Sequence, residues 1–269
     1  MKTFIAATLA LSLLWTFSTM GSAEGADNRI KEIKERGTLR ICLAESRPAN
    51  YKNPATGKWE GYNIDAGANL AETMGVKVEV VDATWGTLIP SLLSGKCDIA
   101  LVGLFRTAER AMSILFSDPW NFNLMEVVVR EDSGLHKYED INKKGVVVVV
   151  ASGTADEAAA KRYFPNAAIR PMVTDSVTAP FLEVAAKRAD AHINDLRNVK
   201  EFLDKNPQMK MRRLGAEPIN PQGISYGIPP GEYQFQQFIN VWHERTDTSG
   251  LKAKWWEKWY GEQPPKLSK

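Results

Sequence analysis

The sequence predicts an α/β fold with two lobes, because one order of strand and helix patterns occurs twice along the chain. In the first half, an apolar strand pattern at residues 39–44 precedes a helix pattern at residues 62–74. Residues 76–81 alternate with period two, and a helix at 88–93 leads to a strand at 98–103. This order favours a mostly parallel sheet flanked by helices.

The second half repeats the order from Gly145 and predicts the second lobe. The expected elements are strands at 146–151, near Ile169 and at 190–193, and helices at 155–164, ending near Lys187, and at 196–203. We expect lobe 1 to begin with residues 24–129, lobe 2 to span 130–222, and residues 223–269 to return to lobe 1. Two strands, at 126–131 and 221–226, would cross between the lobes. The tail predicts helices at 233–245 and 252–260, with the three tryptophans of the second helix forming a packing face.

The N-terminus has the pattern of a secretory signal peptide. Lys2 precedes an apolar run at residues 4–17, and small residues follow up to Ala23, after which we expect cleavage. The run is too short for a membrane span, so residues 1–23 predict export. No cysteine lies beside the cleavage site to carry a lipid, and we therefore expect a periplasmic protein.

Composition excludes several classes of protein. Cleavage would remove Lys2 and no acid, lowering the formal net charge from +2 to about +1, which gives no signature of nucleic-acid or polybasic membrane binding. About 245 mature residues can bury a core without cross-links. Cys42 and Cys97 are expected as buried thiols, because they lie near different ends of neighbouring strands; a disulfide is the alternative.

Several motifs, taken in order, resemble the bacterial extracellular solute-binding proteins of family 3. They cover essentially the whole mature chain and are found at 37–44, 57–65, 85–103, 107–110, 116–120, 152–154, 188–195 and 226–231. The resemblance implies the type II periplasmic-binding fold, in which two hinge strands join two lobes. It also implies a small amino-acid-like ligand, an inner-membrane ABC permease as partner, and no cofactor.

The resemblance implies three contacts with the ligand: one from a basic residue, one from the N-terminus of a helix and one from an acidic residue. Arg110 matches the residue that binds the ligand's α-carboxylate, and its planar fork of donors suits that group. Gly153 and Thr154 precede a helix whose free N–H groups could bind the same carboxylate from the other lobe. Asp195 matches the acid that binds the α-ammonium. The alternatives are a solvated arginine, a plain strand-helix turn, and a cap for the helix at Leu196.

The remaining expected contacts surround these charges. Trp85 matches an aromatic wall, with core burial as the alternative, and Gly103, Phe105, Arg47 and Glu45 complete the expected site.

Departures from the family pattern leave the ligand open. Phe105 replaces a small hydroxyl residue, and Ala44, Arg47 and Ala155 also differ from the common residues. Arg47 and Arg106 could form a second anion site. Asp65 and Asp118 are interpreted as loop or cap residues.

No pattern indicates a metal site or covalent catalysis. The three histidines are isolated, and no nucleotide-binding or nucleophile motif occurs. We expect a monomer that is not an enzyme. The alternatives are an enzyme resembling the periplasmic cyclohexadienyl dehydratases, which need an acid to protonate a leaving hydroxyl, and a ligand-sensing module for a receptor.

Overall fold

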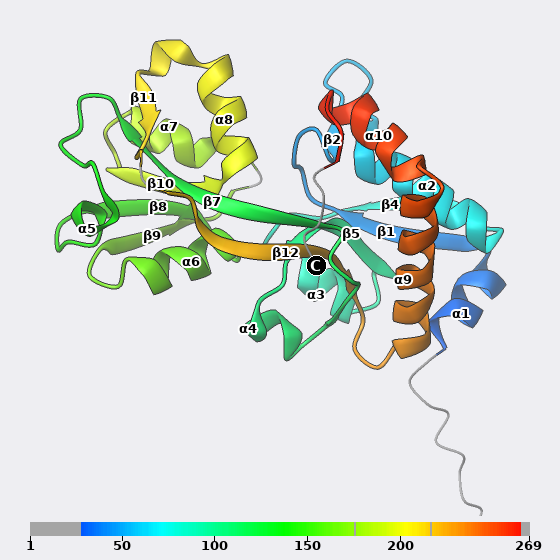
Figure 1. The fold of residues 1–269 in the computed structure, drawn as a ribbon. Helices are drawn as coiled ribbons and strands as arrows, with labels where there is room; N and C mark the ends of the chain where they lie inside the picture. The colour runs from blue at the N-terminus through cyan, green and yellow to red at the C-terminus, as the bar shows by residue number, and fades with distance from the viewer. Residues whose placement is uncertain (1–27, 175, 216, 265–269) are drawn as a thin grey trace, which may run out of the picture.

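Two lobes joined by two long strands make up the protein (Figure 1). The computed structural model describes residues 28–174, 176–215 and 217–264. The connecting strands are β7 (Asn121–Arg130) and β12 (Ile219–Ile228), and they pair antiparallel with each other. The predicted crossings at 126–131 and 221–226 lie within or next to these strands. The predicted signal peptide lies outside the described residues.

Lobe 1 contains the N-terminal elements and the two C-terminal helices. Its elements are α1 (Arg29–Arg36), β1 (Thr38–Leu43), β2 (Tyr51–Lys52), β3 (Trp59–Glu60), α2 (Tyr62–Met74), β4 (Lys77–Asp82), α3 (Leu88–Leu93), β5 (Ile99–Phe105), α4 (Ala108–Ala111), β6 (Leu115–Phe116), α9 (Tyr233–Thr248) and α10 (Leu251–Tyr260).

Lobe 2 lies between the two connecting strands in the sequence. Its elements are α5 (Tyr138–Ile141), β8 (Val147–Ala151), α6 (Ala155–Tyr163), β9 (Ala168–Met172), α7 (Ala179–Ala185), β10 (Ala191–Asp195), α8 (Leu196–Lys205), a 3₁₀ turn (Pro207–Met209) and β11 (Met211–Arg213). The predicted helix 62–74 is found at those residues, and the other predicted elements agree to within a few residues.

The sheets of the two lobes are continuous through the connecting strands. The strand order is β4-β1-β5-β12-β7-β10-β8-β9, with β6 on β12 and β11 on β7. Strands pair in parallel in the body of each lobe, whereas β12 and β7 pair antiparallel with each other and with β5 and β10 respectively. The predicted α/β class with mostly parallel lobe sheets is therefore confirmed. Among the described residues, no helix has the length and apolar character to cross a membrane.

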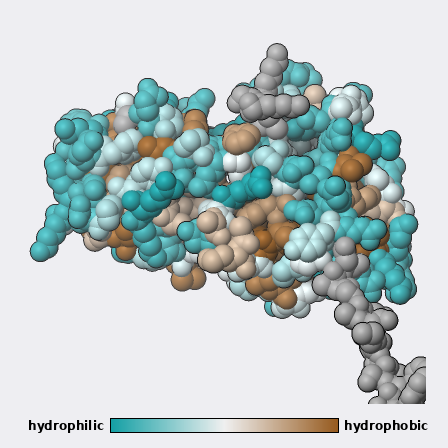
Figure 2. Space-filling view, turned by 60° about the horizontal axis from the view of Figure 1, so that its bottom comes forward, coloured by the Kyte–Doolittle hydropathy of each residue, from teal (hydrophilic) through white to brown (hydrophobic). Residues whose placement is uncertain are grey.

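Helix α10 closes the core of lobe 1 with aromatic side chains. Trp256 is fully buried and lies edge-on to Tyr62, with ring centroids 5.6 Å apart, and Tyr62 stacks on Trp120. The predicted packing role of this tryptophan helix fits these contacts. Asp65 lies inside α2, not in a loop, and its carboxylate accepts hydrogen bonds from Trp259 and Lys258, which fastens α10 to α2. The face drawn in Figure 2 is mostly polar, with apolar residues in smaller areas between.

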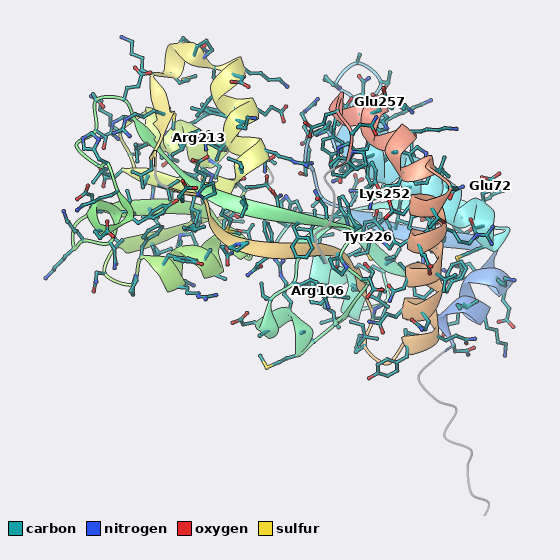
Figure 3. The ribbon with its side chains drawn as sticks, in the orientation of Figure 1. Glu72, Arg106, Arg213, Tyr226, Lys252 and Glu257 are labelled. Atoms are coloured by element: carbon teal, nitrogen blue, oxygen red, sulfur yellow. A yellow bond between two sulfur atoms is a disulfide. The ribbon has the colours of Figure 1, made fainter. Side chains whose placement is uncertain are left out.

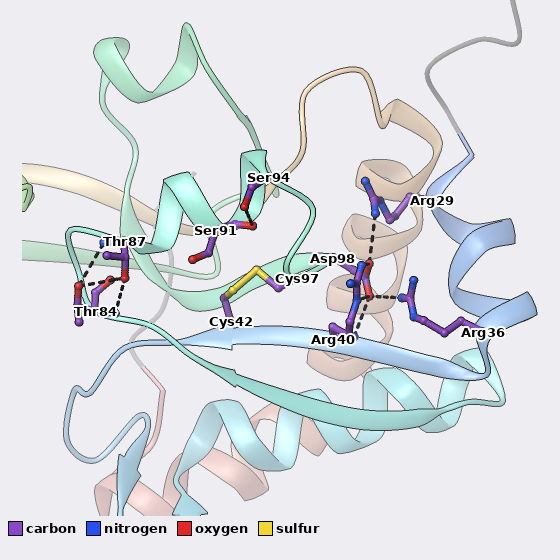
Figure 4. The surroundings of a disulfide bond; sticks show 10 residues. All are labelled: Arg29, Arg36, Arg40, Cys42, Thr84, Thr87, Ser91, Ser94, Cys97 and Asp98. Carbon is purple, nitrogen blue, oxygen red and sulfur yellow. Dashed lines mark hydrogen bonds and ion pairs between the residues drawn. A yellow bond between two sulfur atoms is a disulfide. The ribbon is translucent and has the colours of Figure 1, made fainter.

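The expectation of two free thiols is wrong, because Cys42 and Cys97 form a disulfide with Cα atoms 5.6 Å apart (Figure 4). From the sequence, the two cysteines are expected to be kept apart at different ends of neighbouring strands. Cys97 instead lies in the turn before β5, which begins at Ile99, and there it reaches Cys42 near the end of β1. Next to this turn, the buried carboxylate of Asp98 binds Arg29, Arg36 and Arg40.

Removal of the disulfide is expected to destabilise lobe 1. The bridge closes a loop of 55 residues in sequence separation, so replacing both cysteines by alanine should lower the free energy of unfolding by about 2–5 kcal/mol. Urea denaturation of the variant and of the oxidised protein measures this difference. A thiol titration of the unfolded, unreduced protein should find no free thiol, and two titratable thiols there would contradict the bridge.

Candidate functional site

One cavity lies between the two lobes and receives side chains from both. It measures about 670 Å³ with its open mouth included. Lobe 1 contributes Ser46, Trp85, Gly103, Phe105 and Arg110 to its wall, and lobe 2 contributes Ala151, Thr154, Ala155, Asp156, Thr174, Ser176, Val177, Pro180, Asn194, Asp195 and Asn198. Of the nine residues that the sequence predicted as contacts, the structure brings six together here: Arg110, Asp195, Trp85, Gly103, Phe105 and Thr154.

Arg110 is held in place by its own short helix. The side chain of Thr107 accepts a hydrogen bond from the backbone N–H of Arg110, so Thr107 is the N-cap of α4. The Nη1 atom of Arg110 donates to the carbonyl oxygen of Phe105 at 3.1 Å. Phe105 therefore orients the guanidinium through its backbone, although it lacks the hydroxyl common at this position. The described residues offer the other guanidinium N–H groups no acceptor.

Asp195 combines two roles that the sequence presented as alternatives. It ends β10 and caps α8, because its Oδ1 atom accepts a hydrogen bond of 2.8 Å from the N–H of Arg197. Its side chain also lines the cavity that Arg110 lines from the other lobe. Capping therefore fixes the orientation of the carboxylate at the cavity.

Thr154 and Gly153 are neighbours in the sequence but differ in their position relative to the cavity. Thr154 lines the cavity and caps α6, whereas Gly153 is outside the lining, and its N–H donates to the carboxylate of Glu157 at 2.8 Å. A side chain at position 153 would lie 3.0 Å from the Cα atom of Gly86, so at this point the lobes touch. The role of Gly153 as a ligand contact stays a prediction.

Trp85 and Gly103 shape the wall on lobe 1. The indole N–H of Trp85 donates to the carbonyl oxygen of Glu45 at 3.1 Å, which fixes a half-buried ring at the cavity. A side chain on Gly103 would approach Ile224 to 3.3 Å and Trp120 to 3.5 Å. Glycine therefore keeps this part of the wall open.

Glu45 and Arg47 lie outside the main cavity lining, in neighbouring hollows. They pair with each other at 3.8 Å, and the guanidinium of Arg47 lies 4.0 Å from the ring centroid of Tyr51. Arg106 is exposed on the lobe that carries α4 (Figure 3). The structure does not bring Arg47 and Arg106 together in the cavity, so they do not form a second anion site there.

Asp156 is a cavity residue that the sequence reasoning missed. It lies in the first turn of α6 and is only 8% exposed. An acid in the first turn of a helix is common because it suits the helix dipole, and that made the residue unremarkable. One feature of the sequence could have indicated that Asp156 is buried. It lies on the same side of α6 as the apolar residues Ala155, Ala159 and Ala160, and that side is the buried one.

A chain of neutral polar groups holds Asp156 from behind. The amide nitrogen of Asn194 donates to Oδ2 of Asp156 at 3.0 Å and lies 3.2 Å from Nε2 of His192. Nδ1 of His192 lies 2.8 Å from the carbonyl oxygen of Val149, and Asn198 donates to Oδ1 of Asn194. Burial lowers the pKa of His192 to about 4, so the ring is neutral. A neutral ring that donates from Nδ1 leaves Nε2 as an acceptor, and this fixes Asn194 as a donor to Asp156.

Burial shifts the pKa of each ionisable group among the described lining residues. Burial and, second, the negative charge of Asp195 raise the pKa of Asp156 to about 7, against the positive charge of Arg110. Burial also raises the pKa of Asp195 to about 6, against the hydrogen bond from Arg197. The pKa of Arg110 is lowered by burial, but an arginine remains charged. The cavity is thus lined by one cation from lobe 1 and by two acids from lobe 2 whose pKa values are raised.

Contacts outside the cavity also join the lobes. The guanidinium carbon of Arg197, on α8 of lobe 2, lies 4.8 Å from the ring centroid of Trp256 and 4.9 Å from that of Tyr260, both on α10 of lobe 1. Such cation–π contacts are attractive. Because the N–H of the same residue binds Asp195, the cavity acid is linked directly to the inter-lobe contact. Within the described ranges, no group of three or more His, Cys, Asp and Glu side chains is arranged to hold a metal ion.

The fold and the charged cavity define a two-lobed solute-binding protein. The sequence profile of the bacterial extracellular solute-binding proteins, family 3, matches residues 39–262. The chain belongs to this family, and the predicted resemblance is confirmed.

Relatives of the chain include both an enzyme and binding proteins. It is 25% identical to the cyclohexadienyl dehydratase of Pseudomonas aeruginosa, over 88% of each chain. It is also 25% identical to a probable amino-acid ABC transporter periplasmic-binding protein of Sinorhizobium fredii, over 78% of this chain and 69% of the relative. Among solved structures, an ancestral amino acid-binding protein described as a precursor of cyclohexadienyl dehydratase is 32% identical. It matches with a TM-score of 0.75 over 86% of this chain and 98% of that chain.

The raised pKa of Asp156 should make the empty protein more stable in acid. An unfolded aspartate titrates near pH 4, so between about pH 4 and 7 the folded state holds more protons than the unfolded state. The contribution of Asp156 to the free energy of unfolding is then fully present below pH 4 and is lost as the pH rises through about 7. Its total is on the order of 4 kcal/mol.

Asp156→Asn isolates this contribution, because the buried neutral histidines, which oppose it, are present in both proteins. The difference in unfolding free energy between the native protein and Asp156→Asn, measured by urea denaturation from pH 4 to 8, should fall with rising pH. A difference that stays constant across this range would contradict a raised pKa at Asp156.

Proposed function

We propose that this protein captures a small amino acid or amino-acid-like ligand between its lobes in the periplasm and presents it, as a monomer, to an inner-membrane ABC permease. One observation supports the proposal: Arg110 from lobe 1 and Asp195 from lobe 2 line the same cavity. A ligand with a carboxylate and an ammonium group would pair with both. The family, which is extracellular, and the binding-protein relatives support this function.

The ligand would act by joining the lobes. Arg110 and Trp85 offer a first contact on lobe 1, and closure about β7 and β12 brings Asp195 and Thr154 onto the same molecule. A ligand shifts the balance between open and closed forms only by its difference in affinity for the two. The permease would then recognise the closed form.

Loss of either charge should weaken binding strongly. Arg110→Ala or Asp195→Ala leaves a buried ligand charge without its partner, which costs about 2–5 kcal/mol of binding free energy. The ligand is first found by thermal unfolding of refolded, ligand-free protein against amino acids, opines, polyamines and dicarboxylates. Isothermal titration calorimetry then gives each variant's affinity.

Two further variants serve as controls. Asp195→Asn retains an acceptor for the N–H of Arg197 and so separates loss of charge from loss of the helix cap. Arg106→Ala removes an exposed arginine outside the cavity and should leave the affinity within about twofold. A change under about twofold in Arg110→Ala or Asp195→Asn would remove that residue from the site.

Asp156 favours a second candidate function, a dehydratase-like enzyme. Such a reaction on prephenate needs an acid that gives its proton to the leaving hydroxyl, which departs as water, while the ring carboxylate leaves as carbon dioxide and its bonding electron pair completes the aromatic ring. A buried carboxyl group with a pKa near 7 is suited to that step at neutral pH, and the similarity to the Pseudomonas aeruginosa dehydratase points the same way.

Incubation with prephenate tests this candidate. An enzyme should produce phenylpyruvate, measured by its ultraviolet absorbance, and Asp156→Asn should lower the rate at least about a hundredfold, since general acids contribute about 10²–10⁴. Glu157→Gln, which changes a neighbouring acid outside the cavity, should retain the rate. Absence of phenylpyruvate with the native protein would reject the enzyme and leave the binding function.

A further inference from the structure

The charges of the cavity do not balance for a ligand without net charge. Among the lining residues that the structure describes, Arg110, Asp156 and Asp195 carry the ionisable groups, and together they have a net charge of −1 when both acids are ionised. A zwitterion carries one carboxylate and one ammonium group. It can satisfy Arg110 and one acid, but the second acid would remain a buried carboxylate without a cation, or would have to take up a proton.

Asp156 is positioned to receive a charged partner. Its side chain is more than nine-tenths buried, and the hydrogen bonds of the described residues engage only Oδ2. Its neighbours in that network, Asn194 and His192, are neutral and bring no positive charge. The cation that faces it is Arg110, which is also the expected partner of the ligand's carboxylate.

We infer that Asp156 selects amino acids that carry a second cationic group, with a net charge of +1. Such a ligand places its carboxylate on Arg110 and its two cationic groups on Asp195 and Asp156, so that each buried charge meets one opposite charge. This inference rests on the proposed function and specifies its ligand class.

The cavity also has room for a side chain that ends in a cation. It adjoins a second hollow of about 1150 Å³, and the two share Ser176, Val177 and Asn198 as lining residues. The second hollow contains Glu201 and Glu45, each already paired with a basic residue of its own. Asp156 lines the first cavity and not the second hollow, so a ligand whose second cationic group meets Asp156 keeps that group in the first cavity.

Arginine and citrulline provide the test, because they have nearly the same shape and differ by one positive charge. Calorimetry at pH 8, where both acids ionise, should give the native protein at least tenfold tighter binding of arginine than of citrulline. Asp156→Asn keeps an acceptor for Asn194 and removes the charge. It should weaken arginine binding, and the preference should fall to about threefold or less.

Glu157→Gln is the matched control for a general effect of charge. Glu157 is the next residue on the same helix, and its carboxylate is occupied by Lys161 and the N–H of Gly153, outside the cavity. Its replacement should preserve the preference for arginine.

The other possible results would contradict either the inference about Asp156 alone or the proposed function as well. Equal binding of arginine and citrulline by the native protein overturns the inference without any variant, and so does an unchanged preference in Asp156→Asn. Binding of glutamine with no binding of arginine also overturns it, while the proposed function survives. If no amino acid of the panel binds, the proposed function fails together with the inference.

Discussion

Burial of unlike charges between the lobes is the constraint on which the rest of the structure depends. Arg110 on one lobe and two carboxylates on the other face a single cavity, and all three lose hydration there. Such groups are stable in a folded protein only when opposite charges or hydrogen bonds compensate them. The empty cavity compensates them incompletely, and this deficit is the free energy that a matching ligand can recover on binding.

The scaffold keeps these charges separate until the lobes approach each other. Arg110 is fixed within lobe 1 by Thr107 and Phe105, and Asp195 is fixed within lobe 2 by the first turn of α8. In the part of the chain that the structure describes, β7 and β12 connect the two lobes covalently, while Arg197 on α8 contacts the aromatic rings of α10. Closure therefore joins two preformed half-sites, and the Arg197 contact adds attraction that needs no ligand.

The sequence predicted most of the fold, and six of the nine predicted contact residues line the cavity. Elements such as α2 follow from periodicity and a terminal glycine, and Arg110 and Asp195 follow from motifs in a fixed order. The disulfide was missed because cysteines near different ends of neighbouring strands were expected to lie far apart, and strand limits alone do not give the Cα separation on which bond formation depends. Asp156 was missed because burial depends on how α6 lies against β10, which a single helix pattern does not specify.

The same acid has opposite effects on the empty and the occupied protein. Without a partner, ionised Asp156 opposes folding, since burial and the charge of Asp195 both raise its pKa. With a cation beside it, the same burial strengthens the attraction, because the surroundings screen it less than water does. A residue that reduces stability while it serves a site is typical of functional positions, where local energetics and overall folding conflict. The alanines beside Asp156 on the buried side of α6 are apolar, as packing in a core requires. Among the buried residues that the structure describes in α6, Asp156 is the ionisable one, and packing alone does not require it.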